Sequence, residues 1–158
     1  MENINEKAIN IAIEEAKVNL ENNYQNGGPF GAVIVKDGKI ISRAHNTVIE
    51  SMDATAHAEV NAIRMASKIL NTHDLSDCVL YASSEPCPMC LSAIIWANIK
   101  EVHYANSAKE AEEIGFRDDM IYEYIRGNND LIKMNHIPNK NAKEVFNTFK
   151  ELENKKMY

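Results

Sequence analysis

Hydrophobic positions in the first third of the chain recur first with the period of a helix and then with that of strands. From about Asn5 to Glu21 apolar side chains return every three or four residues, which predicts an amphipathic helix. Short apolar runs at Ala32–Val35 and Ile40–Ile41 then flank Asp37-Gly38, a pair typical of hairpin turns. The pattern therefore predicts a helix followed by a β-hairpin.

The rest of the chain alternates between helical and strand patterns. Further helices are expected from Thr55, as N-cap, to Asn71, and from Pro86 and Pro88 onward. The other expected elements are strands at Cys78–Tyr81, Lys100–Ala105 and Ile132–Met134, helical segments to about Arg126, and a last helix at Asn141–Asn154. This alternation predicts an α/β fold, a three-layer α/β/α sandwich with a mixed five-stranded central sheet, with Ile95 and Trp96 in its core.

Length, charge and cysteine count narrow the class of protein. A chain of 158 residues suits a single domain over residues 1–158. A net charge of −6 without a basic cluster argues against a nucleic-acid partner and favours a small neutral substrate. The chain shows neither a signal peptide nor an apolar run long enough for a bilayer, so we expect no membrane partner and a cytoplasmic location. Three cysteines fit reduced thiols better than a disulfide framework.

Two short motifs carry the candidate chemistry: His57-Ala58-Glu59, and Pro86-Cys87-Pro88-Met89-Cys90. Cys87 and Cys90 share one face of a helical turn and can hold one metal ion. With His57 they make three zinc ligands, which leaves a fourth tetrahedral position for water, as in catalytic zinc sites. Glu59 diverges from His57 by roughly 200° on a regular helix, so we expect it to serve as acid/base rather than as a ligand.

These motifs resemble the zinc-dependent cytidine/deoxycytidylate deaminase superfamily. Four segments are similar, more closely, to the bacterial guanine deaminases within it. They are Gly27-Gly28-Pro29-Phe30-Gly31, Thr55-Ala56-His57-Ala58-Glu59, Glu85-Pro86-Cys87-Pro88-Met89-Cys90 and Ile114-Gly115-Phe116. The resemblance covers nearly the whole chain and implies a cytidine deaminase-like fold, one Zn²⁺ per subunit, and hydrolytic deamination of guanine to xanthine and ammonia.

The resemblance also assigns roles to individual residues. It implies that Phe30 packs on the purine, that Asn46 hydrogen-bonds the ring, and that Asp118 receives the exocyclic amine or assists proton transfer. It further implies a homodimer in which a segment from about residue 128 to 158 is exchanged, so that Tyr158 reaches the partner subunit's pocket. The chain departs from the family at two positions: Ala54 replaces a proline, and Arg117 replaces a phenylalanine.

Several alternatives stay open at this point. Phe30 could be core, Asn46 a turn residue, Asp118 a helix cap and Tyr158 a solvated tail. The substrate could be cytosine, a nucleoside or adenosine in transfer RNA. The protein could also be a zinc- or nucleotide-binding module, a thiol-disulfide oxidoreductase that uses Cys87 and Cys90, or a structural zinc protein with Cys78 as fourth ligand.

Overall fold

A mixed four-stranded sheet forms the centre of the computed structural model, which describes residues 3–158. The strands are β1 (Gly31–Lys36), β2 (Lys39–His45), β3 (Cys78–Ser84) and β4 (Glu101–Asn106). They lie in the order β2-β1-β3-β4. β1 pairs antiparallel with β2 and β3, whereas β3 and β4 are parallel.

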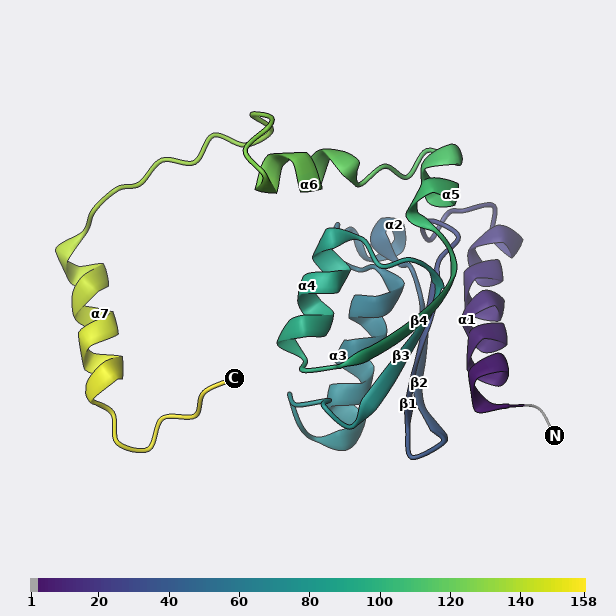
Figure 1. Cartoon of the computed structure of the whole chain (residues 1–158), viewed down its shortest axis with the longest axis horizontal. Helices are drawn as coiled ribbons and strands as arrows, with labels where there is room; N and C mark the ends of the chain where they lie inside the picture. Colours follow the sequence, from purple (N-terminus) through teal and green to yellow (C-terminus); the bar gives the residue numbers. More distant parts are fainter. Residues whose placement is uncertain (1–2) are drawn as a thin grey trace.

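Helices cover both faces of this sheet (Figure 1). α1 (Ile4–Glu21) packs on one face, and α3 (Ala58–Leu70) with α4 (Pro88–Trp96) packs on the other. Successive strand residues point to opposite faces, so Ile34 joins the apolar cluster beneath α3 and α4 while Val33 joins the cluster beneath α1. The predicted three-layer α/β/α arrangement is confirmed.

The remaining helices are α2 (Val48–Ser51), α5 (Ala108–Glu113), α6 (Asp119–Ile125) and α7 (Lys140–Glu151). α2 was not predicted, because four residues are too few to show a helical period. After α6 the chain forms an extended arm that carries α7 away from the sheet (Figure 1). Every residue from 130 to 158 is exposed.

The prediction of a fifth strand is wrong. Ile132–Met134 has no strand conformation, and the sheet of the described residues ends at β4. The alternation of apolar and polar residues is present there, but a strand also needs a neighbouring strand for its hydrogen bonds. In this arm Ile132 and Met134 are instead exposed.

Two further predictions need correction. The N-cap of α3 is His57 rather than Thr55. The Thr55 amide and hydroxyl both donate to Asp53 Oδ1, at 2.8 and 2.7 Å, in a turn before the helix. Ile95 and Trp96 are exposed at 63% and 65%, because they lie on the outer face of α4 rather than against the sheet.

Among the described residues, no helix has the length and apolarity needed to cross a bilayer.

Candidate metal centre and active site

His57, Cys87 and Cys90 meet where two helices begin beside the sheet. His57 is the N-cap of α3, Cys87 is the N-cap of α4, and Cys90 lies in the first turn of α4. His57 Nδ1 lies 3.5 Å from Cys87 Sγ and 3.4 Å from Cys90 Sγ. The ligand atoms of all three residues lie within 4.8 Å of one another.

These separations fit one tetrahedral zinc ion. Zinc bonds of about 2.3 Å to sulfur and about 2.05 Å to nitrogen place the two ligand atoms about 3.5 Å apart. The His57–Cys87 and His57–Cys90 separations of 3.5 and 3.4 Å match that spacing. The donor set therefore fits Zn²⁺, with one of the four tetrahedral positions left to a non-protein ligand.

The surroundings favour thiolate at Cys87. A hydrogen bond from Cys90 lowers the pKa of Cys87 to about 4, and His57 acts in the same direction. The same hydrogen bond, together with burial, raises the pKa of Cys90. The amides at the start of α4 add positive potential at both sulfur atoms.

Cys78 plays no part in this cluster. It lies at the opposite end of β3 from Ser84, which lines the candidate site, and its thiol donates to Asp77 at 3.4 Å. Burial raises the pKa of Cys78 to about 11. Of the residues from 3 onward, only His57, Cys87 and Cys90 form a group that could hold a metal ion, which disfavours the closed structural site with Cys78 as fourth ligand.

Glu59 lies directly beside the metal-ligand triad. Its Oε2 atom is 3.5 Å from Cys90 Sγ, and the residue is only 7% exposed. The angular argument from a regular helix does not hold across His57, because His57 has extended backbone angles and only Ala58 begins the helix. Burial is the main cause that raises the pKa of the Glu59 carboxyl group above its usual value.

One cavity of about 830 Å³ joins this centre to most of the predicted substrate residues. His57, Glu59 and Cys87 line it together with Phe30, Asn46 and Asp118. The cavity is therefore large enough for a purine base, with apolar and polar groups on its wall.

Phe30 and Asn46 combine structural contacts with a place on the cavity wall. The Phe30 ring packs edge-on against Phe116 at a centroid distance of 4.9 Å and also touches the core cluster. Asn46 is buried, and its Oδ1 atom accepts a hydrogen bond from the Val48 amide at 3.1 Å. The core and turn roles considered for these residues are present, but both residues also face the site.

Asp118 occupies the N-cap position of α6 without making a capping hydrogen bond. Burial, followed by the nearby charge of Cys87, raises the pKa of its carboxyl group. The neighbouring Arg117 does not neutralise Asp118, because its guanidinium pairs with Glu112 at 3.5 Å and Asp119 at 3.0 Å. Asp118 thus lines the cavity, and its carboxyl group is not used to cap α6.

Tyr158 lies outside the cavity of its own chain. Its ring is 5.8 Å from Trp96 and 6.5 Å from His73, and the residue is 82% exposed. Tyr158 therefore does not contribute to the cavity of its own chain, and the role that the family resemblance implies for it, in a partner's pocket, stays a prediction.

The cavity wall also contains residues that carried no role in the sequence analysis. Phe116 could have been found, because it belongs to the Ile114-Gly115-Phe116 segment. Tyr24 and Ile49 could not, because nothing in the local sequence brings the segment after α1 and the helix α2 to the same cavity. The unassigned lining residues include Tyr24, Ile49, Met89, Ile114, Phe116 and Arg117.

Comparison with known proteins adds to this geometry. A family model described as the cytidine and deoxycytidylate deaminase zinc-binding region matches residues 2–106. Guanine deaminase of Bacillus subtilis (strain 168) is 52% identical over 119 residues, which cover 75% of this chain and 72% of that protein. A tRNA-specific adenosine deaminase of Aquifex aeolicus (strain VF5) is 37% identical over 147 residues, 92% of this chain and 94% of that one.

A solved structure supports the same relationship. The X-ray structure of guanine deaminase from Bacillus subtilis has a TM-score of 0.88 and 43% identity to this chain. The match covers 97% of this chain and 98% of the other.

Proposed function

Because this chain belongs to the cytidine and deoxycytidylate deaminase family, we propose that it is a zinc-dependent hydrolase that converts guanine and water into xanthine and ammonia. The observation that carries the proposal is that a buried carboxyl group, Glu59, adjoins a triad fit for zinc on the wall of one cavity. The similarity to guanine deaminase of Bacillus subtilis supports guanine as the substrate.

His57, Cys87 and Cys90 are the proposed zinc ligands. A zinc ion bound by such ligands acts as a Lewis acid and lowers the pKa of water from about 15.7 to about 7. Glu59 would take the proton that this water loses and deliver it to a ring nitrogen as the oxygen attacks carbon 2. It would then take the remaining proton from the new hydroxyl group on carbon 2 and pass it to the amine, which leaves as ammonia. The raised pKa of Glu59 suits a group that must both accept and donate a proton.

Three residues are proposed to orient the base. Phe30 offers its ring to the purine face. Asn46 uses Oδ1 for the Val48 amide, which leaves its side-chain nitrogen as a donor to a ring acceptor. Asp118 receives the exocyclic amine, and the pairing of Arg117 with Glu112 and Asp119 leaves the Asp118 carboxyl group available for this contact.

The proposal extends to a homodimer of single-domain subunits, each spanning residues 1–158, in which a segment from about 128 to 158 is exchanged and Tyr158 enters the partner's cavity. The exposure of all residues from 130 to 158 supports it. A cytoplasmic location is also proposed, because Cys87 and Cys90 must stay reduced to bind zinc and are free in the structure.

Ammonia release by the zinc-loaded protein tests the reaction. The panel is guanine, cytosine, adenine, their nucleosides and a transfer RNA with an adenosine anticodon position. Release from guanine alone is expected. Release from transfer RNA would favour the adenosine deaminase alternative, which the net charge of −6 disfavours. Binding without release, or thiol-disulfide cycling without zinc, would support the non-hydrolytic alternatives.

A further inference from the structure

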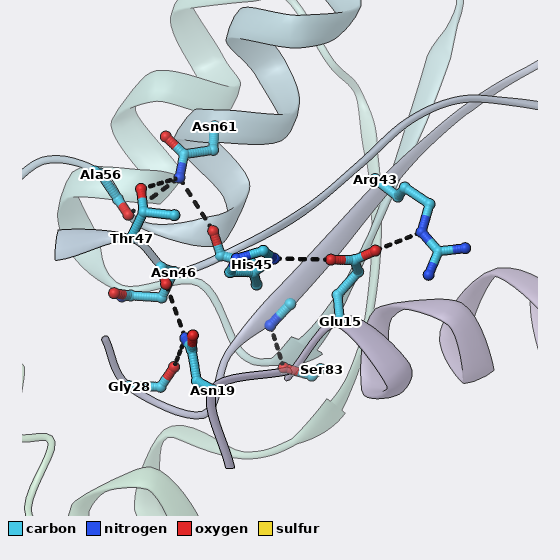
Figure 2. Close-up of polar contacts among 11 residues, drawn as sticks. Glu15, Asn19, Gly28, Arg43, His45, Asn46, Thr47, Ala56, Asn61 and Ser83 are labelled. Atoms are coloured by element: carbon cyan, nitrogen blue, oxygen red, sulfur yellow. Dashed lines mark hydrogen bonds and ion pairs between the residues drawn. The ribbon is translucent and has the colours of Figure 1, made fainter. Parts of the chain in front are cut away.

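We infer that Asn19, on the far side of the sheet from the zinc ligands, is a positioning residue that sets the substrate contacts of Phe30 and Asn46. This inference rests on the proposed function of the cavity. Asn19 is fully buried near the carboxyl end of α1. Its side-chain nitrogen donates to the Gly28 carbonyl at 2.7 Å and to the Asn46 carbonyl at 2.8 Å (Figure 2).

These two carbonyls belong to the two segments that hold the proposed substrate residues. Gly28 lies in the loop that leads to Phe30, and Asn46 directly follows β2. The Phe30 amide donates to Gly28 O at 2.9 Å, and the Asn46 amide donates to Phe30 O at 3.1 Å. Asn19 therefore closes a ring of hydrogen bonds in which any displacement of Gly28 is passed to both substrate residues.

The loop is packed too closely to find an alternative position easily. A Cβ atom on Gly27 would lie 2.1 Å from Asn46 Oδ1, and a Cβ atom on Gly28 would lie 2.8 Å from the Phe30 ring. Glycine is thus required here for close approach of the backbone to the substrate residues. The side-chain nitrogen of Asn19 holds that approach in one place.

The orientation of the Asn19 amide is fixed by its partners. A reversed amide would set its oxygen against two carbonyl oxygens, which are acceptors only. In the observed orientation Asn19 Oδ1 is buried without a partner among the described residues. An unpaired buried acceptor is unfavourable for folding. Asn19 therefore contributes to the structure through the two hydrogen bonds that its side-chain nitrogen donates.

The helix that carries Asn19 is itself held rigidly against the sheet. One turn earlier, Glu15 binds the Arg43 side chain, and it contacts His45 Nδ1 at 3.0 Å (Figure 2). Gly31 lets α1 approach so closely that a Cβ atom there would lie 2.1 Å from Ala12 O. Asn19 therefore has a fixed base from which it can place Gly28 and Asn46.

The test compares Asn19→Ala and Asn19→Ser with Ser42→Ala. Asn19→Ser is the milder change and serves if Asn19→Ala does not fold. Ser42 is the matched control, because its buried hydroxyl donates to Ala62 O at 2.8 Å and it does not line the cavity. The readouts are zinc content, KM and kcat for ammonia release from guanine, and amide hydrogen exchange of residues 26–31 and 45–49.

We expect the Asn19 variants to keep zinc and to raise KM about tenfold with a smaller change in kcat. A tenfold change in KM corresponds to about 1.4 kcal/mol, which is the size of a lost hydrogen bond. The amide hydrogens of both segments should also exchange faster. Ser42→Ala should leave KM and these segments unchanged. If the wild type is active and the Asn19 variants have the same KM as the wild type, the inference about Asn19 is overturned but the proposed function is not. A wild type that releases no ammonia from guanine would overturn the proposed function, while hydrogen exchange would still decide whether Asn19 holds the loop.

Discussion

The buried carboxyl group of Glu59 lies beside the zinc-binding triad, and the proposed reaction depends on the ability of this group to carry protons. Glu59→Gln keeps the shape of the side chain but removes that ability. We expect this variant to lose about 10²–10⁴-fold in kcat for ammonia release, the usual contribution of general acid–base catalysis. Zinc content should stay at one ion per chain, because Glu59 is not one of the three clustered ligands.

Glu14→Gln is the control for this variant, since Glu14 is an exposed acid on α1 away from the cavity. It should match the wild type in both activity and zinc content, as measured by ammonia assay and elemental analysis. Turnover of Glu59→Gln within a factor of about three of the wild type would remove Glu59 from the mechanism.

A titratable contact between the Glu15 carboxyl group and the side chains of Arg43 and His45 holds α1 on the sheet. Burial alone raises the pKa of Glu15, but hydrogen bonds from Arg43 and His45 outweigh it and hold the pKa below the usual 4.5. A lowered pKa in the folded state means that the contact stabilises the protein above pH 4.5 and is lost as the pH falls through the lowered value. We therefore expect Glu15→Gln to unfold about 1.5–3 kcal/mol more easily at pH 7, as hydrogen bonds to charged groups contribute.

The measurement is urea unfolding of wild type, Glu15→Gln and Glu14→Gln between pH 7 and pH 3. The difference between the wild type and Glu15→Gln should shrink below pH 4.5, whereas Glu14→Gln should follow the wild type throughout, including any effect of zinc release in acid. A difference that stays constant down to pH 3 would contradict the role given to the charged form of Glu15.

The carboxyl-terminal arm leaves apolar side chains without cover in a single chain. On α7, Phe146 is 80% exposed and Val145 is 65% exposed, and on the outer face of α4 Trp96 is 65% exposed. Exposed apolar surface of this kind is typical of interfaces between proteins, which agrees with the proposed exchange between subunits. We expect the full chain to be a homodimer and Phe146→Asp to weaken the dimer at least about 30-fold, as loss of a buried anchor of 2 kcal/mol or more does.

Analytical ultracentrifugation over a concentration series measures this change. Asn147→Asp introduces the same side chain at the neighbouring polar position of α7 and should leave the dimer intact. A wild type that sediments as a monomer at all concentrations would contradict the dimer, and equal effects of the two substitutions would contradict an interface at Phe146.

Two short motifs were sufficient to predict the metal ligands, although only the tertiary structure brings His57 to within 3.5 Å of Cys87. Cys87 and Cys90 share one helical turn whatever surrounds them, and His57 stands at the start of its helix as expected. The positions of α1, the β1–β2 hairpin, β3 and β4 also follow from periodicity and turn residues. Phe30, Asn46 and Asp118 line the cavity, although only the family resemblance selected them.

The sequence alone determined which two short motifs can supply zinc ligands and which segments form helices or strands, because each motif and each period depends on residues a few positions apart. Only the tertiary structure decided that Ile132–Met134 has no strand to pair with, that Glu59 lies beside Cys90, and that Asn19 bridges Gly28 and Asn46. Each of these depends on two distant segments meeting within hydrogen-bond distance, and no local pattern encodes such a meeting.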